Sequence, residues 1–175
     1  MSLLKANKRI ACPELSFKRS TVTRYNGVVA KRVAQAVFNP SANTGERTIA
    51  AHGLGVYLPD NAVLTAAFYD VVTTFTSAGA DAGTIALHAQ AADDIVAAIA
   101  ISDASNPWDA GIHGTKIGYP NLGADAAHDS ALEVAALFAG TMLKLTAERE
   151  LTATVATQAL TAGKLVLYVE YVLGD

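Results

Sequence analysis

The sequence predicts a mainly β protein: an antiparallel β-sandwich or jelly-roll-like body with one short helix, preceded by an extended basic N-terminal arm. Three observations predict this class. Short segments of alternating apolar and polar residues recur along the chain, with turn residues between them. Half of the 175 residues are hydrophobic, enough to bury a core, and only 17% are charged. No repeat of fixed period is present. We assign the arm to residues 1–32 and the body to residues 33–175.

The first part of the chain leads from the arm into strands. Residues 1–18 show neither helical nor strand periodicity and are interpreted as extended. Residues 19–26 alternate threonine and tyrosine with valine and arginine, which predicts a strand. Residues 28–38 fit a strand or an amphipathic helix, because their apolar positions match either period. Residues 39–45 are rich in Asn, Pro, Ser and Gly and predict a loop.

The next segment contains two short strands, a turn and a long β-forming run. Residues 48–51 and 55–58 are expected to form strands on either side of a glycine break. Pro59-Asp60-Asn61 predicts a turn, because proline fixes φ and the Asx residues bond locally. Residues 62–76 are rich in Val, Phe, Tyr and Thr and are long enough for one bent strand or two.

The middle of the chain is ambiguous between helix and strand. Residues 77–83 predict a loop, and residues 84–90 alternate as a strand does. Asp93 and Asp94 could cap a helix over residues 95–102, but the Ile and Val content of that segment is equally consistent with a strand.

A long stretch without clear periodicity follows. Residues 103–129 are rich in Gly, Asp, Asn and Pro, and we expect an ordered excursion or binding loop, because structureless loops of this length are uncommon. Residues 131–138 are short and alanine-rich and give the best helix prediction in the chain.

The C-terminal segment has the clearest alternation. Residues 151–157 and 165–172 each alternate with period two, and Thr161-Ala162-Gly163 lies between them. This pattern predicts an antiparallel hairpin. The core face is assigned to one set of alternate residues, Leu165, Leu167, Val169 and Tyr171. The opposite face then carries Tyr168, Glu170 and Val172.

Charge divides the chain into two parts. Residues 1–47 hold nine basic and two acidic residues, a charge of +7, and the remaining residues hold four basic and 14 acidic ones, a charge of −10, which together give the net −3. Such asymmetry is typical of a basic interaction tail on an acidic body. The residues predicted to bind a partner through the arm are Lys5, Lys8, Arg9, Lys18, Arg19 and Arg24. Contact with nucleic acid is conceivable for this arm, but its spacing matches no nucleic-acid-reading motif, so an acidic protein surface is favoured.

Several function classes find no support in the sequence. No uncharged run exceeds 13 residues, and the one at residues 151–163 is too short and too rich in Thr for a membrane span. The single Cys12 excludes an internal disulfide framework, and synthesis in a reducing cytoplasm is expected. No phosphate-binding, dinucleotide-binding or nucleophile motif occurs. We therefore predict no enzyme activity, no catalytic residues and no cofactor.

The histidines do not form a metal-binding pattern. None of the four, His52, His88, His113 and His128, shares the spacing that places two ligands on one face of an element. A site built from His113 with Asp109 is kept as a weak alternative. No metal is predicted.

The chain's one tryptophan lies in Asn106-Pro107-Trp108-Asp109-Ala110-Gly111. A tryptophan in a loop can stack on a sugar or anchor a partner, so Trp108 is a candidate loop contact. The structural alternative, which we favour, is that the indole fixes this loop onto the sandwich.

Residues 47–62 begin a resemblance to a known family. It continues through residues 69–75, residues 95–102 with the 106–111 motif, and residues 147–154. Together these segments resemble small structural proteins of tailed bacteriophages that decorate, or cement, the capsid. The likeness covers about residues 45–175 and leaves the arm outside.

The resemblance implies a β-sandwich that assembles as a homo-oligomer, with a trimer expected, on the capsid surface of the virion. Its implied partners are further copies of itself and the major capsid protein, with no membrane. The implied function is stabilisation of the capsid by bridging major capsid subunits. The alternative is a receptor- or glycan-binding module of a head fibre or tail, with Trp108 at the contact.

Overall fold

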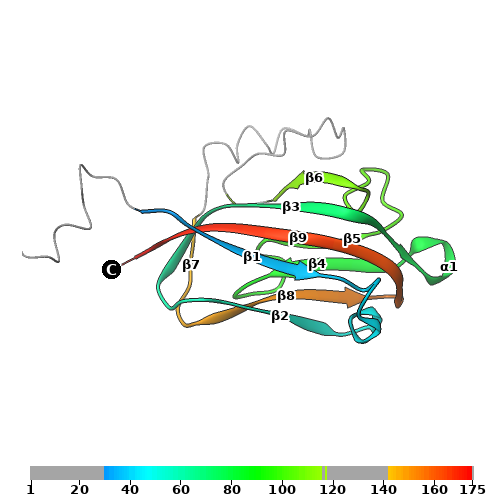
Figure 1. Ribbon diagram of the computed structural model, residues 1–175, viewed down its shortest axis with the longest axis horizontal. Coiled ribbons are helices and arrows are strands. Elements are labelled where there is room, and N and C mark those ends of the chain that lie inside the picture. Colours follow the sequence, from blue (N-terminus) through cyan, green and yellow to red (C-terminus); the bar gives the residue numbers. More distant parts are fainter. Residues whose placement is uncertain (1–29, 116, 118–141, 175) are drawn as a thin grey trace, which may run out of the picture. The chain divides into compact units, whose positions relative to one another are not determined.

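The computed structural model describes residues 30–115, 117 and 142–174 (Figure 1). The chain divides into two units, Met1–Ala30 and Lys31–Asp175, and all the described strands belong to the second. The predicted strand at residues 19–26, the predicted helix at residues 131–138, Cys12 and His128 lie outside the described residues.

The described residues form nine strands and two short helical turns. The strands are β1 (Arg32–Phe38), β2 (Ala51–Leu58), β3 (Ala62–Ser77), β4 (Thr84–His88), β5 (Val96–Ala100), β6 (Gly111–Gly114), β7 (Leu143–Lys144), β8 (Arg149–Ala156) and β9 (Leu160–Leu173). The helical turns are a 3-10 helix, η2 (Thr44–Arg47), and α1 (Ala78–Asp81). The predicted mainly β class is confirmed.

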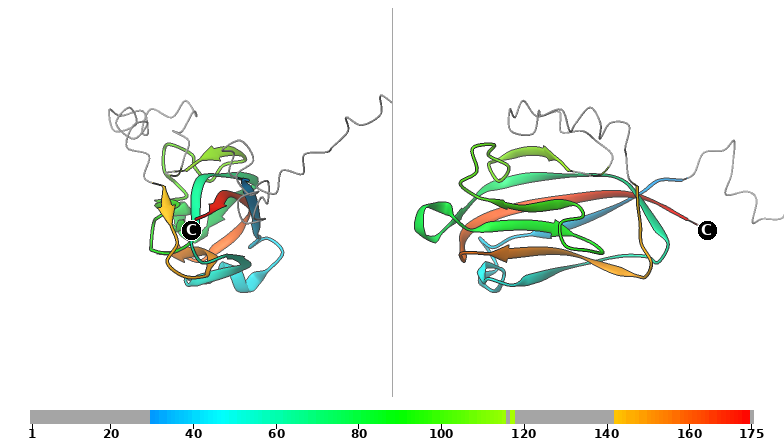
Figure 2. Two further views of the ribbon diagram at one scale, coloured as in Figure 1. Left: turned by 90° about the vertical axis from the view of Figure 1, so that its left-hand side faces the viewer. Right: turned by 180° about the vertical axis from the view of Figure 1, so that it is seen from behind.

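The strands pack as two antiparallel sheets in a sandwich (Figures 1 and 2). Sheet A has the order β1-β9-β3-β6, with β7 also pairing with β3, and sheet B has the order β2-β8-β4-β5. The pairs β1–β9, β2–β8, β3–β6 and β4–β5 are nested one inside another along the chain. This nesting, divided between a five-stranded and a four-stranded sheet, is the topology of a jelly roll.

The core lies between the two sheets and consists of alternate residues of nearly every strand. On β9, Leu165, Leu167 and Val169 are buried and Tyr171 packs against the core, which confirms the predicted inward face. The largest fully buried side chains are Trp108, Tyr69, Phe38, Phe75, Leu58, Leu64, Ile85, Leu87, Ile95, Leu145, Leu151 and Leu165.

The predicted C-terminal hairpin is wrong. Strands β8 and β9 lie in different sheets, and the chain crosses between them at Thr157–Ala159, where Thr157 adopts a positive φ of 65°. Alternation with period two is the same for two paired strands and for two strands that face one core from opposite sheets. The predicted turn, Thr161-Ala162-Gly163, is part of β9.

The strand predicted at residues 48–51 is wrong except at Ala51, and the one predicted at residues 55–58 is part of a longer strand, β2, that begins at Ala51. β2 runs through Gly53 and Gly55, and its register with β8 shifts between Gly53 and Tyr57. Gly55 adopts a φ of 69°, and its amide donates to Glu150 Oε1 at 2.8 Å. The glycines therefore make a β-bulge rather than a strand end.

Other ambiguous segments are resolved as strands. Residues 32–38 form β1, so the helical alternative for residues 28–38 is wrong over that part, and residues 62–77 form the single strand β3. Residues 96–100 form β5, which excludes the capped helix there. The excursion from residue 103 contains β6 at residues 111–114. The turn at Pro59-Asp60-Asn61 is confirmed, with Asn61 at a φ of 60°.

Gly163 gives a test of how tightly the sheets pack. Its φ is 141°, and an added Cβ would lie 2.1 Å from Cδ1 of the Phe75 ring. We expect Gly163→Ala to lower the free energy of unfolding by about 3 kcal/mol or more, from backbone strain and overpacking. Gly55→Ala is the matched control, because Gly55 also has a positive φ but nothing lies within 4 Å of its added Cβ. It should cost about 1–2 kcal/mol. Urea unfolding measures both, and equal losses would contradict the packing argument.

Candidate interaction surface

The outer face of sheet A carries exposed apolar side chains across several strands. One row of paired residues crosses the sheet from edge to edge. Val37 of β1 pairs with Val166 of β9, and Val166 also pairs with Asp70 of β3. Asp70 in turn pairs with Ile112 of β6. Ile112 is 75% exposed and Val37 is also exposed. Asp70 is the charged member of this row, and the other three residues are apolar. Exposed apolar residues such as Val37 and Ile112 are typical of a protein–protein contact.

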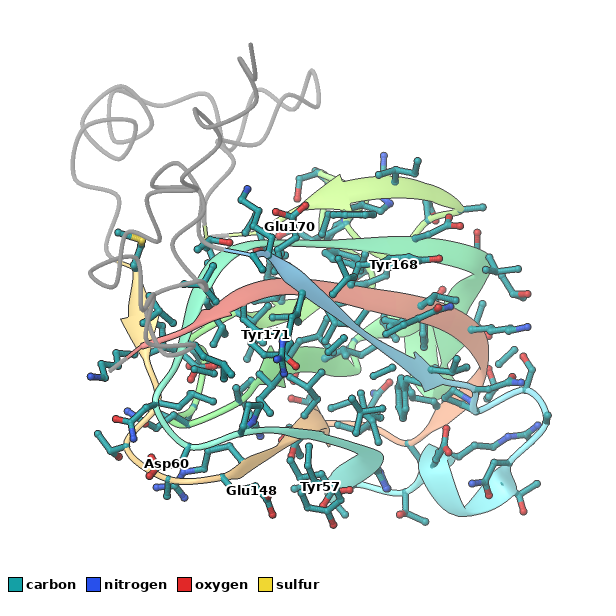
Figure 3. The ribbon with its side chains drawn as sticks, turned by 60° about the vertical axis from the view of Figure 1, so that its left-hand side comes forward. Tyr57, Asp60, Glu148, Tyr168, Glu170 and Tyr171 are labelled. Atoms are coloured by element: carbon teal, nitrogen blue, oxygen red, sulfur yellow. The ribbon has the colours of Figure 1, made fainter. Side chains whose placement is uncertain are left out.

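An adjacent row contains an aromatic pair. Gln35 of β1 lies beside Tyr168 of β9, which lies beside Phe68 of β3. The rings of Phe68 and Tyr168 stack with centroids 4.8 Å apart. Figure 3 shows Tyr168 on this outer face and Tyr171 directed to the interior. The alternation of the sequence separates the two faces of β9 correctly but does not show that exposed apolar residues of other strands continue the outer one.

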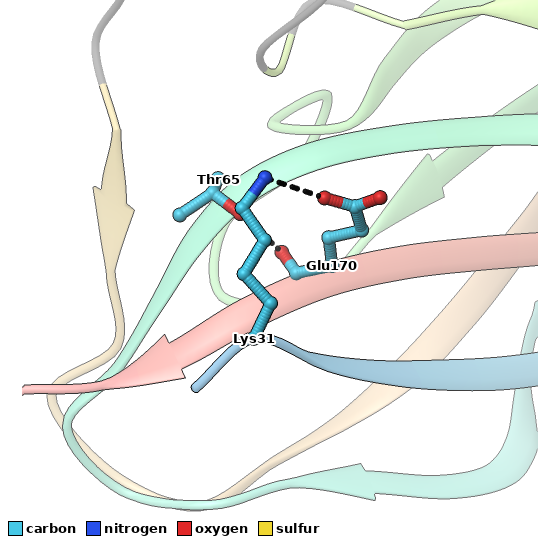
Figure 4. Close-up of polar contacts among 3 residues, drawn as sticks. All are labelled: Lys31, Thr65 and Glu170. Atoms are coloured by element: carbon cyan, nitrogen blue, oxygen red, sulfur yellow. Dashed lines mark hydrogen bonds and ion pairs between the residues drawn. The ribbon is translucent and has the colours of Figure 1, made fainter. Parts of the chain in front are cut away.

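A charged pair, Lys31 with Glu170, lies near the start of β1. Lys31 Nζ is 3.0 Å from Glu170 Oε2, and Thr65 Oγ1 donates to the Glu170 carbonyl oxygen at 3.4 Å (Figure 4). The lysine side chain is 59% exposed, so the ion pair contributes at most about 1 kcal/mol. It fixes the start of β1 to β9, next to the point where the described chain begins.

Trp108 lies in the core and not on the surface. It is 1% exposed, its Nε1 donates to the Ile99 carbonyl oxygen at 3.1 Å, and its ring packs against Tyr69 and Phe75. The Tyr69 hydroxyl donates to the Pro107 carbonyl oxygen at 2.9 Å. This arrangement matches the structural alternative, in which the indole fixes the loop. A role for Trp108 as a partner contact stays a prediction.

The described histidines are held separately. His113 Nε2 is 2.8 Å from the backbone oxygen of Asp109, not its carboxylate, and the ring stacks on Tyr69. His52 Nε2 is 2.8 Å from the Thr48 oxygen, and His88 Nε2 is 3.4 Å from Thr154 Oγ1. In the part of the chain that the structure describes, no group of three or more His, Cys, Asp or Glu residues is arranged to hold a metal ion.

The adjacent aspartates stabilise a turn. The Asp94 carboxylate accepts bonds from the amides of Ala89, Gln90 and Ala91 at 2.8–2.9 Å. Asp93 Oδ1 accepts from the Ala98 amide at 3.1 Å. They therefore fix the β4–β5 connection, and the predicted helix-capping role is wrong because no helix follows.

Glu150 performs a similar structural task in sheet B. Its carboxylate occupies the space above Gly53 and accepts a bond from the Gly55 amide. The negative charge of Glu150, and more weakly that of Glu148, raises the pKa of Tyr57. Figure 3 shows Tyr57, Glu148 and Asp60 at one margin of the molecule.

The predicted arm residues lie beyond the described part of the chain. Lys5, Lys8, Arg9, Lys18, Arg19 and Arg24 all belong to this group. Of the predicted site residues, the structure therefore places only Trp108. Within the described ranges, neither short helix has the length or hydrophobicity of a membrane span.

Comparison with known proteins identifies the fold. No family model matches the sequence, and no curated protein matches it significantly. Among solved structures, the fold is similar to a chain of the acid-stable capsid of Helicobacter pylori bacteriophage KHP30, with a TM-score of 0.51 and 13% identity over 83% of this chain and 90% of that chain. It is also similar to a chain of the cyanophage Pam1 capsid, with a TM-score of 0.52 and 14% identity over 82% and 85%. At these identities the likeness shows a shared fold: a jelly roll of the kind found in two phage capsids.

Burial of Tyr69 predicts a loss of stability at alkaline pH. Burial raises the pKa of its phenol above the ordinary value, whereas the unfolded chain releases that proton near pH 10. The unfolded state then binds fewer protons above about pH 10, so stability falls as the pH rises. Tyr69→Phe should cost about 1 kcal/mol at neutral pH through the lost hydrogen bond, but should lose less stability on going to about pH 11. Urea unfolding over this pH range measures both, and parallel curves would contradict the prediction.

The position of Trp108 predicts that its substitution affects folding. Trp108→Ala should lower the free energy of unfolding by about 3–5 kcal/mol, because it leaves a cavity beside Tyr69 and Phe75. Trp108→Phe should lose less, because a ring remains. Thermal and urea unfolding provide the measurement. A Trp108→Ala variant with wild-type stability but altered partner binding would instead place the indole at an interface.

Proposed function

We propose that this chain is a structural protein of a bacteriophage capsid. The observation that carries the proposal is the fold: the jelly roll matches chains of two phage capsids over more than four-fifths of this chain and of each of those. Of the segments that resemble capsid decoration proteins, residues 47–62 include β2 and its flanking loops, and the others include parts of β3, β5 and β8. The role requires shape and contact area, and no catalysis, cofactor or metal.

Within the capsid, we infer a decoration or cement role, in which the protein bridges major capsid subunits at the outer surface. The exposed apolar residues of sheet A support this role. Apolar surface in contact with water is unfavourable, so a neighbouring protein that covers this face would stabilise the assembly. The low proportion of charged residues is consistent with surface meant for contacts. A homo-oligomer, with a trimer expected, would repeat these contacts around a symmetry axis.

The arm, residues 1–32 by the sequence assignment, is proposed as a second contact. Its basic residues would attract an acidic protein surface, on the capsid or on a neighbouring copy. A tethered arm adds avidity without enlarging the folded body, because the second contact forms at a high effective concentration. Its contribution should weaken as salt screens the charges.

Deletion of residues 1–18 tests the arm. The shortened protein should keep the unfolding transition of the β-sandwich but co-sediment at least tenfold more weakly with capsids that lack the decoration protein. A full-length variant with Lys5, Lys8, Arg9 and Lys18 replaced by Gln is the matched control for charge, and should lose most of the same affinity at low salt. Wild-type binding by both variants would exclude the arm's role. Failure of the wild-type protein to bind capsids would exclude the decoration function itself.

A further inference from the structure

The four sheet edges of the jelly roll differ in how they are protected against pairing with another chain. An edge strand offers free backbone groups to any extended partner, and proteins usually shorten, bulge or charge such strands. β6 has four residues with glycine at each end, β5 has five residues, and β2 carries the bulge between Gly53 and Tyr57. β1 has seven residues and pairs with β9 in unbroken register throughout. Among the edges formed by the described residues, β1 is the least protected.

The outer edge of β1 is open within the described structure. Among the described residues, β9 is the only strand that pairs with β1, and Figure 2 shows β1 at the margin of sheet A. Val33 is 60% exposed, and Val37 and Gln35 are exposed as well. No charged residue occurs between Arg32 and Glu46. Nothing in this stretch repels an incoming strand.

The sequence of β1 is suited to one particular partner. Val33-Ala34-Gln35-Ala36-Val37 reads the same in both directions. When such a strand pairs antiparallel with its own copy about Gln35, valine faces valine, alanine faces alanine, and glutamine faces glutamine. Cross-strand pairs of this kind are favourable, and no like charges come opposite each other. A two-fold contact uses the same patch on both molecules, and residues 33–37 would pair with residues 33–37 of the second copy in this way.

We propose that two copies of this chain associate through their β1 edges, antiparallel and centred on Gln35, so that the two sheets A become one continuous sheet. In this register Arg32 lies opposite Phe38 of the second copy, beside the Asn39 amide, which donates to Glu46 Oε2 at 2.6 Å. The basic start of each strand therefore lies near a carboxylate at the end of the other. The pairing does not depend on the capsid role.

Opposite charges at the two-fold axis test the association. Gln35 is exposed, so neither Gln35→Lys nor Gln35→Glu should disturb the fold, which circular dichroism and urea unfolding can verify. Each variant alone places like charges face to face. In sedimentation velocity the mass of its main species should be half that of the wild type, a monomer in place of a dimer or a trimer in place of two paired trimers. An equimolar mixture of the two should restore the wild-type mass. Ile112→Lys and Ile112→Glu, at the opposite edge of the same sheet, are the matched controls and should leave the mass unchanged.

Cysteine cross-linking tests the register. In a Cys12→Ser background, Gln35→Cys should form a disulfide-linked dimer rapidly, because directly opposed residues have Cα atoms about 5 Å apart, within disulfide range. Val33→Cys should not cross-link to itself, since the two copies of residue 33 would lie about 13 Å apart along the strand. Mixed Val33→Cys and Val37→Cys proteins should cross-link. A monomeric wild type, a mass unaffected by Gln35→Lys, or equal self-cross-linking at residues 33 and 35 would each overturn the proposal. A wild-type trimer whose mass does not change with Gln35→Lys would also overturn the β1 pairing, but it would not contradict the proposed capsid function.

Discussion

The pairing of β3 with β9 is the constraint on which the rest of the jelly roll depends. These two strands pair from Ala62 with Leu173 at one end to Ser77 with Leu160 at the other, and every other strand of sheet A attaches to one of them. The pairing brings Gly163 against Phe75, whose ring also packs on Phe38 and Trp108. A side chain at Gly163 would push that ring away from its neighbours. One missing Cβ therefore allows β1, β3 and the Trp108 loop to share a core.

The sequence predicts the class of fold and the facing of its residues, but not which strands pair. The alternation on β8 and β9 identifies the buried residues correctly, because burial depends only on the period of two. Pairing depends on whether Thr157–Ala159 turns the chain within a sheet or carries it across to the other, and residue alternation is identical in both cases. The glycines at 53 and 55 show the same limit, since a bulge and a strand end require the same residue type.

The sequence predicts the candidate surface less well than it predicts the fold. Trp108 stands out by its rarity, yet the structure uses it to fix a loop to the core. The acidic residues Asp94 and Glu150 accept bonds from backbone amides in a turn and a bulge. The outer face of sheet A is assembled from residues far apart in the chain, such as Val37 and Ile112, so only the strand order brings it together. The signal that could have been found is the symmetry of residues 33–37.

The position of β1 relates this edge to the proposed arm. In the sequence assignment the basic arm leads into β1, and the Lys31–Glu170 ion pair holds the residue before this strand near β9. If two β1 strands pair antiparallel about Gln35, the two copies of Arg32, where the strands begin, lie at opposite ends of the paired strands, about 20 Å apart. The two arms would then begin at different places and could contact two different neighbours. A symmetric edge contact would thereby make one small protein bivalent, which is what a bridging role requires.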